Sequence, residues 1–196
     1  MVKLTGMERT HLEELLQQMA VNGVIEYNWE NPQHEKQYVL PMYVPGSAEF
    51  TNMNADVLRN HPEMGRFFER MSRLPLEKVT PMVPLGGAGI GMHVIPVEKA
   101  IEMENHSVSV EHISHWLDKY EGKYAASPCS CRRSRVTYDE GCADDPEGWC
   151  IAVGDMADYV VETNKGGRYI TREEVYEILE QAEENGFVHQ ITNIDG

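Results

Sequence analysis

The 196-residue chain lacks any long hydrophobic run. Its longest apolar stretches, residues 82–85 and 94–97, fall far short of the ~20 residues that a membrane-spanning helix requires. The first residues also lack the uninterrupted apolar core of a secretory signal. We therefore expect a cytoplasmic protein with no membrane partner, in a compartment where thiols stay reduced.

Basic residues are scarce. Seventeen Lys and Arg residues oppose 32 Asp and Glu residues, which gives a formal net charge of −15. Such a charge repels phosphate backbones and anionic membranes over a Debye length of roughly 8–10 Å. Nucleic-acid binding is therefore not expected. With 41% hydrophobic and 25% charged residues, the composition is that of an ordinary soluble globular protein.

Several motifs of catalysis and nucleotide binding are also missing. The glycine-rich residues 86–91 lack the Gly-Lys-Ser/Thr ending of a phosphate loop. A proline precedes these glycines and a strand-like run follows them, which is the wrong order for a dinucleotide-binding motif. A redox Cys-x-x-Cys pair is absent, and no Ser-His-Asp arrangement can be identified from spacing. We therefore assign no catalytic residue.

The N-terminal residues 1–54 are predicted to form a winged-helix-like segment. Apolar residues at helical spacing predict a helix at 10–22, and two short strands follow at 24–29 and 36–40. Residues 41–54 read as an extended connection. A packing or interaction role is favoured over DNA reading, because the acidic residues of the helix would face phosphate unfavourably.

The rest of the chain is predicted to be mainly helical. The fold class is therefore α+β, with the winged-helix-like segment followed by a helical cysteine-cluster domain. Residues 55–120 read as a helical linker region with a short strand, and residues 121–196 as a four-cysteine metal-binding domain. Helical spacing predicts helices at 55–71 (with Pro62 opening a second stretch), 109–120, 151–164 and 171–185, and a strand at 92–97; Thr171 and Glu174 form a capping box.

The four cysteines, Cys129, Cys131, Cys142 and Cys150, all lie within 22 residues. Their pattern is Cys-x-Cys, ten residues, Cys, seven residues, Cys. Four thiols can close a tetrahedral zinc site or supply one thiolate to each iron of a cubane cluster. Prolines and glycines around them suit loops that wrap a metal, so we predict one site with these four ligands.

The spacing of the first two cysteines favours an iron-sulfur cluster. Structural zinc sites more often present thiols two to four residues apart, whereas Cys129 and Cys131 are separated by one residue. We therefore predict a [4Fe-4S] cluster, with zinc as the alternative. Disulfides are a third interpretation, which a reducing compartment disfavours.

Three arginines follow the second cysteine. Arg132, Arg133 and Arg135 could offset the negative charge of a thiolate-ligated cluster, and their alternative role is in ordinary salt bridges with the acidic residues that follow. His189 comes just after the predicted helix 171–185 and could fold back on the cluster, or it could make a structural hydrogen bond. We name Arg132, Arg135 and His189 as candidate cofactor-binding residues.

These motifs resemble the N-terminal iron-sulfur region of anaerobic bacterial 4Fe-4S and pyridine-nucleotide-linked oxidoreductases. The resemblance covers most of the chain, although only its cysteine portion is specific. The matching segments are residues 40–50, residues 129–132 (Cys-Ser-Cys-Arg) with Cys142 and Cys150, residues 170–174 (Ile-Thr-Arg-Glu-Glu), residues 186–189 (Gly-Phe-Val-His) and Asn193.

The resemblance implies an electron-transfer part of an oxidoreductase rather than an independent enzyme. In that family the region precedes a ferredoxin-like segment and sometimes a flavin-dependent module. The implied partner is a flavoprotein or a ferredoxin-like redox protein. We expect it to be met in cis, if this chain is a piece of a longer protein, or in trans. The alternative function is a structural zinc-binding winged-helix module with an interaction or regulatory role.

Overall fold

The computed structural model describes residues 1–41, 46–75, 91–94, 112–140 and 148–193. Three features predicted above lie outside these ranges: Cys142, residues 86–90 of the glycine-rich segment, and the ends of two predicted elements at 109–111 and 95–97. The fold and the candidate site are therefore described from the remaining residues.

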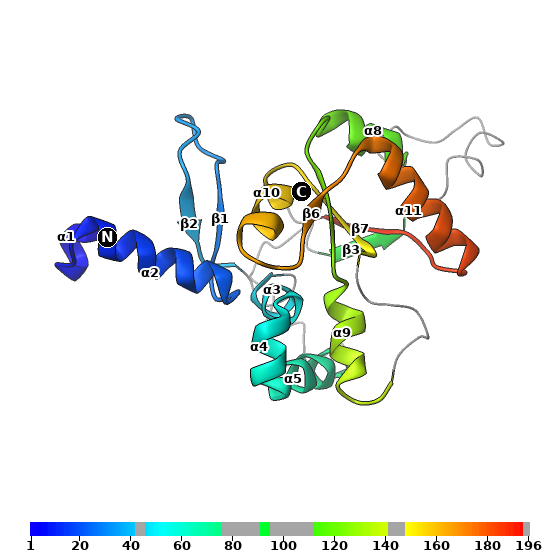
Figure 1. Cartoon of the computed structure of the whole chain (residues 1–196), viewed down its shortest axis with the longest axis horizontal. Coiled ribbons are helices and arrows are strands. Elements are labelled where there is room, and N and C mark those ends of the chain that lie inside the picture. Colours follow the sequence, from blue (N-terminus) through cyan, green and yellow to red (C-terminus); the bar gives the residue numbers. More distant parts are fainter. Residues whose placement is uncertain (42–45, 76–90, 95–111, 141–147, 194–196) are drawn as a thin grey trace.

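The protein is α+β, as predicted, with helices and small antiparallel sheets (Figure 1). The described helices are α1 (Val2–Thr5), α2 (Arg9–Val21), α3 (Ala48–Met53), α4 (Ala55–Asn60), α5 (Pro62–Ser72), α8 (Ile113–Lys119), α9 (Ser130–Val136), α10 (Asp155–Glu162) and α11 (Arg172–Glu184). The strands are β1 (Glu26–Asn28), β2 (Gln37–Val39), β3 (Gly91–Val94), β4 (Tyr124–Ser127), β5 (Cys150–Val153), β6 (Arg168–Tyr169) and β7 (Gln190–Asn193).

The strands pair in three separate antiparallel sheets. β1 pairs with β2 and β3 with β7, and the third sheet has the order β5-β4-β6. All four residues of its central strand β4 are buried. Helix α10 packs on this sheet, while α3 and α5 pack on α9, which continues from the end of β4. In Figure 1 these last helices gather with α4 below the sheet, and α1 and α2 project to one side.

The N-terminal helix and hairpin form as predicted. Leu12, Leu16 and Ala20 recur at every fourth position of α2, and all three are buried. The chain turns after α2 at Gly23, whose φ is +80°. A Cβ at Gly23 would lie 2.5 Å from the backbone nitrogen of Thr51, so only glycine fits there.

One hydrophobic core joins segments that are distant in the sequence. Its central ring is Tyr159 of α10, which is buried and lies edge-on against Tyr27 and Phe50. The hydroxyl oxygen of Tyr159 lies 3.2 Å from the carbonyl oxygen of Ala20 and 3.0 Å from that of Ile25. The core contains Leu12, Leu16, Ala20, Ile25, Tyr27, Phe50, Met53, Ala125, Ala157, Tyr159 and Val160.

A fully buried lysine lies beside this core. The ammonium group of Lys165 donates to the carbonyl oxygens of Ala20 at 2.7 Å, Val21 at 2.6 Å and Thr163 at 3.3 Å. Two of these carbonyls belong to the last turn of α2, where the helix leaves them without intrahelical donors. Lys165 therefore caps α2 from a distant part of the chain.

Two sequence predictions about local structure were wrong. Residues 41–54 were expected to be extended, but α3 occupies 48–53, because Phe50 and Met53 of this segment are buried in the core. Residues 151–164 were expected to be one helix, but Ile151 pairs with Ala126 in the sheet. The helix α10 begins only after Gly154, whose φ of +62° turns the chain.

Other predictions were confirmed. Pro62 is in the first turn of α5, where its missing N–H costs nothing. The capping box of α11 is present, with Thr171 accepting from the backbone N–H of Glu174 and the Glu174 carboxylate accepting from that of Thr171. Among the described residues, no helix has both the length and the apolar character needed to span a bilayer.

We predict that Lys165→Met destabilises the fold by about 1–3 kcal/mol near pH 7, because the carbonyls of Ala20 and Val21 each lose one buried donor. Chemical denaturation measures this loss. Lys123→Met is the matched control, because the Lys123 side chain is half exposed and pairs with Asp158 at the surface. Its expected cost is under about 1 kcal/mol.

The difference in stability between the wild type and Lys165→Met should depend on pH. Burial lowers the pKa of Lys165 from 10.5 to about 7, so between these values the unfolded chain holds a proton that the folded protein has released. The stability of the wild type therefore rises with pH across this range relative to Lys165→Met. Parallel pH dependence in the two proteins would contradict this assignment.

Candidate metal centre

The first two cysteines lie where strand β4 passes into helix α9. The strand ends at Ser127, Pro128 follows, Cys129 precedes the helix and Cys131 is its second residue. Sequence reasoning expected loops around this pair, whereas a buried strand and a short helix hold it. The pair is therefore attached to the best-packed part of the sheet.

The register of the sheet brings the last cysteine to the first two. Cys150 begins β5 and pairs with Ser127, two residues before Cys129. The Ser127 hydroxyl also donates to the Cys150 carbonyl at 3.4 Å. Strand pairing thus closes the 21-residue separation between Cys129 and Cys150.

The three described thiols meet at Cys129. Its sulfur accepts hydrogen bonds from the thiols of Cys131 and Cys150 and from the backbone N–H of Arg132. These bonds lower the pKa of Cys129, while donation to Cys129 raises the pKa of the other two thiols. All three are free thiols; Cys129 and Cys150 are half-buried and Cys131 is exposed.

The thiols are close together but do not form a finished coordination sphere. Among the described residues, no three His, Cys, Asp or Glu side chains surround a point where a metal ion would sit. The hydrogen bonds run from Cys131 to Cys129 and from Cys150 to Cys129, so they converge on a sulfur atom rather than on an empty centre. Cys142, the fourth predicted ligand, lies outside the described ranges.

Arg132 is the predicted cofactor-binding residue that the structure places at the thiols. Its positive charge contributes to the lowered pKa of Cys129 and partly offsets the raised pKa of Cys150. The guanidinium carbon lies 3.8 Å from the ring centre of Phe187 and 5.6 Å from that of Trp149. The two rings meet edge to face, with centres 5.3 Å apart. Aromatic faces thus hold this cation beside the sulfurs.

Arg135 and His189, also predicted as cofactor-binding, have other partners. The guanidinium of Arg135 lies 3.7 Å from the carboxylate of Glu69. His189 Nε2 lies 3.0 Å from a carboxylate oxygen of Glu183. Neither side chain contacts a thiol in the part of the chain that the structure describes.

Sequence reasoning did not identify two glutamates near the site. Glu49 of α3 accepts the backbone N–H of Gly46 at 2.6 Å, burial raises the pKa of its carboxyl, and its charge raises the pKa of Cys131. Glu69 of α5 is buried and lies 3.1 Å from the Ser134 hydroxyl of α9. Both reach the site through packing between helices, which no local pattern signals.

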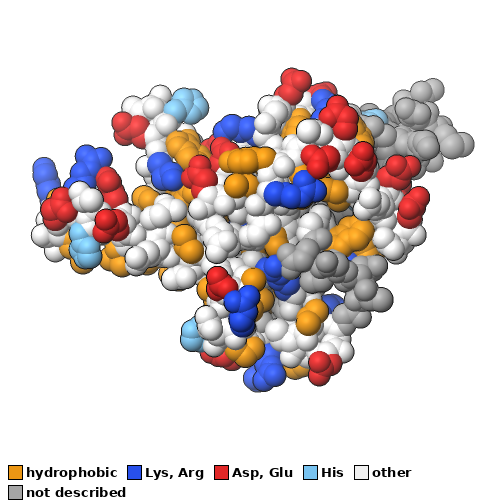
Figure 2. Space-filling model, viewed as in Figure 1, with side chains coloured by type: hydrophobic (Ala, Val, Ile, Leu, Met, Phe, Trp, Pro, Cys, Tyr) orange, Lys and Arg blue, Asp and Glu red, His pale blue; other side chains and the backbone are white. Residues whose placement is uncertain are grey.

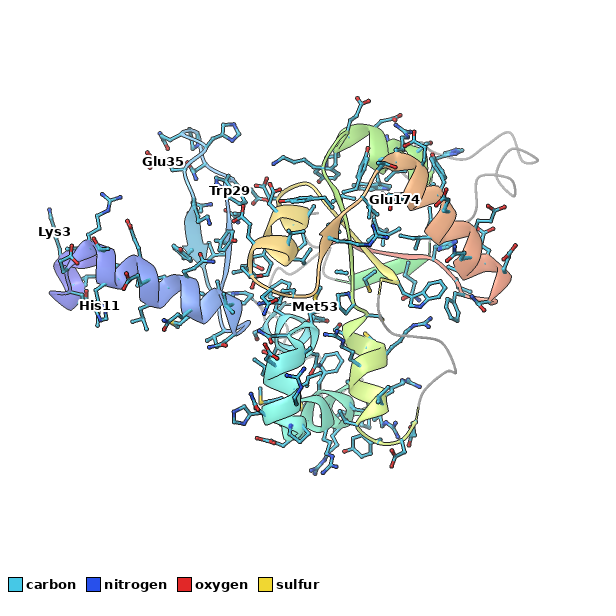
Figure 3. All side chains as sticks on the ribbon, viewed as in Figure 1. Lys3, His11, Trp29, Glu35, Met53 and Glu174 are labelled. Atoms are coloured by element: carbon cyan, nitrogen blue, oxygen red, sulfur yellow. The ribbon has the colours of Figure 1, made fainter. Side chains whose placement is uncertain are left out.

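Helix α9 makes hydrogen bonds to both α3 and α5. The Ser134 oxygen also lies 2.8 Å from the Cys131 carbonyl, so α5 contacts the cysteine backbone through one hydroxyl. On the other side, Arg133 donates to the carbonyl of Met53, which Figure 3 labels near the junction of α3 and the sheet. The cysteines therefore rest on a helix that α3 and α5 both hold.

Gly166 packs closely against the side chain of Pro128, the residue before Cys129. Its φ is +75°, and a Cβ there would lie 2.8 Å from Cγ of Pro128.

We predict that Gly166→Ala destabilises the protein by roughly 1–3 kcal/mol more than Gly186→Ala, because inserting a side chain into a packed site is costly. Denaturation of the metal-free proteins measures the difference.

Gly186 is a matched control because its φ is also +75° but a Cβ there would meet nothing within 4 Å. Both variants incur the penalty for placing alanine at positive φ, roughly 1 kcal/mol. Only Gly166→Ala should also alter the rate at which Cys129 is alkylated. Equal effects in both variants would show that the Pro128 contact does not position the thiol.

No protein-family model, curated protein or solved structure matches this chain. The resemblance drawn from its motifs therefore stays a prediction.

Proposed function

We propose that this chain is an iron-sulfur electron-transfer module of an anaerobic oxidoreductase. Its cluster relays electrons to or from a flavoprotein or ferredoxin-like partner, supplied in cis or in trans. The observation that supports this most is the convergence of Cys129, Cys131 and Cys150 from a strand end, a helix and a paired strand.

The donor set fits a [4Fe-4S] cluster. All the converging donors are thiols, the ligands that iron-sulfur clusters prefer. Cys142 is the proposed fourth ligand, from residues 141–147 between α9 and β5. When bound, the cluster supplies a one-electron relay. Hydrogen bonds from Cys131, Cys150 and the Arg132 peptide lower the pKa of Cys129, which favours the thiolate that binds iron.

The surroundings suit a negatively charged centre. The Arg132 peptide N–H donates to the Cys129 sulfur, and the Arg132 guanidinium lies among Trp149 and Phe187. Hydrogen bonds to cluster sulfurs and nearby positive charge both stabilise the reduced state of such clusters. The aromatic rings restrict water on one side of this cation. Arg132 is therefore the proposed regulator of the cluster's potential.

The N-terminal segment is proposed to be a winged-helix-like packing module. Helix α2 precedes the β1–β2 hairpin, as in the second half of that motif. Leu12 and Tyr27 of these elements are buried in the core that also holds Tyr159. Glu8 caps α2, and Glu13 and Glu14 lie in its middle, so the helix would present carboxylates to phosphate, which opposes a role in DNA reading.

The alternative is a structural zinc site in an interaction or regulatory module. Zinc also accepts four thiolates, and Arg132 would stabilise that anionic complex too. The two proposals share their ligands and differ in redox chemistry. Metal analysis therefore decides between them.

Anaerobic purification, or reconstitution with iron and sulfide, is expected to give a brown protein with about four irons and four sulfides per chain. Electron paramagnetic resonance should show a signal after reduction. Cys131→Ser should weaken the signal and lower the iron content, whereas Ser72→Ala on α5 should leave both unchanged. A colourless protein that keeps one tightly bound zinc after reconstitution would refute the cluster.

A second prediction concerns the potential. Arg132→Gln removes the cation beside Cys129 and Cys150 and should make the midpoint potential more negative, because the reduced cluster loses its nearest positive charge. Redox titration followed by paramagnetic resonance measures the shift. Arg172→Gln makes the same change of charge at an arginine that pairs with Asp118, and it should shift the potential less. Equal shifts would show that Arg132 acts only through net charge.

A further inference from the structure

The arginines of this acidic chain are concentrated around helices α5 and α9. Residues 55–75 and 130–140 hold seven arginines and five acidic residues, a formal charge of +2 in a chain of −15. The lower lobe in Figure 2 shows both Lys/Arg-coloured and Asp/Glu-coloured side chains. The region next to the thiols therefore differs in sign from the protein as a whole.

Four of these arginines lie along one side of the lobe. Arg66, Arg70 and Arg73 follow one another at four- and three-residue spacing on α5, so they share a side of the helix. Arg135 of α9 lies next to them, because it and Arg73 contact the same buried carboxylate of Glu69. Arg66 and Arg70 are exposed and form no ion pair within the described residues; the Arg66 guanidinium donates to the carbonyl oxygen of Thr137 at 3.3 Å.

Two exposed aromatic rings complete this surface. Phe67 is 51% exposed and Tyr138 is 37% exposed. The Tyr138 hydroxyl lies 3.4 Å from the Arg66 carbonyl, and the Arg73 guanidinium lies 5.6 Å from the Tyr138 ring centre, so α5 and the end of α9 form one continuous surface. We call Arg66, Phe67, Arg70, Arg73, Arg135 and Tyr138 the α5–α9 face.

The α5–α9 face is close to the candidate cluster. Cys131 and Arg135 are four residues apart on α9, which at 1.5 Å per residue is about 6 Å along the helix axis. Cys131 is also the exposed thiol of the three. A protein docked on this face would therefore lie near the edge of the cluster that is least covered.

We propose that the α5–α9 face is the docking surface for an acidic redox protein that carries one electron. The inference rests on the proposed function. The reduced carrier transfers one electron to the oxidised cluster. No covalent bond forms or breaks in this step. Arginine and aromatic residues are enriched at protein interfaces, and complementary charge both steers encounter and sets orientation.

A compact acidic protein fits this surface better than a nucleic acid does. The remainder of the chain is strongly negative, and a duplex carries one charge per roughly 1.7 Å, so it would extend from the α5–α9 face over repelling surface. An acidic protein can present its carboxylates to Arg66 and Arg70, which are not ion-paired within the described residues, while Arg73 is paired with Glu69 and Glu140. The same field turns the carrier toward the α5–α9 face and away from the rest of the molecule.

The test uses the full chain with its reconstituted cluster and reduced flavodoxin, an acidic one-electron carrier, as the probe. Arg66→Glu/Arg70→Glu should slow cluster reduction at low salt by about tenfold or more, and the loss should shrink as salt rises. Flavodoxin affinity, measured by titration, should fall in parallel. The milder Arg66→Gln/Arg70→Gln pair should show the same trend with less risk to folding.

Lys3→Glu/Arg9→Glu is the matched control. It makes the same change of charge on helices α1 and α2, and Figure 3 shows Lys3 far from α5. Its rate and affinity should stay within about twofold of the wild type. If both double variants slow the reaction alike, if neither does, or if flavodoxin neither binds nor reduces the wild type, the docking surface is refuted.

Dithionite separates this inference from the proposed function. As a small reductant it should reduce the cluster equally fast in all variants. If dithionite reveals no reducible cluster, the proposed function fails, and the titration alone decides whether the α5–α9 face binds the acidic protein. If a DNA duplex binds the wild type through Arg66 and Arg70 while flavodoxin does not, the partner class is wrong.

Discussion

The buried ammonium group of Lys165 links the segment between α10 and β6 to the end of helix α2. It has three carbonyl partners and no carboxylate partner within the described residues, and two of those carbonyls end helix α2. Burying a charged group is costly unless hydrogen bonds satisfy it, so the position of Lys165 is tightly constrained. Its neighbour Gly166 packs on Pro128, and Pro128 leads into Cys129. The N-terminal helix and the thiols are thus linked through one short segment.

From this anchor, ordinary sheet geometry builds the candidate centre. Pairing of Ser127 with Cys150 brings a distant thiol to the end of β4, and Cys131 lies in the first turn of α9, which follows β4. Glu69 and Met53 then hold α9 from two sides through Ser134 and Arg133. Packing of β4, β5 and α9 therefore fixes the backbone that carries Cys129, Cys131 and Cys150, the three described thiols of the proposed cluster.

Local signals predicted local structure well. The apolar spacing of α2 and the Thr171 capping box of α11 depend on neighbours within a few residues, and both elements formed as expected. Helix α3 and strand β5 were missed because burial of Phe50 and pairing of Ile151 depend on distant residues. The proposed cofactor-binding residues also divide into those placed by sequence neighbours and those placed by distant contacts. Arg132 follows Cys131 directly and reaches the thiols, whereas His189 instead contacts Glu183.

The sequence by itself determined the α+β class, the clustering of four thiols and the arginine beside them, because these are properties of composition and spacing. Only the tertiary structure decided that three of the thiols meet at Cys129, since strand register lies outside any local pattern. It also decided that arginines of α5 and α9 share one surface in an acidic chain. Two helices far apart in sequence must pack before their charges can add, and only packing around Glu69 brings them together.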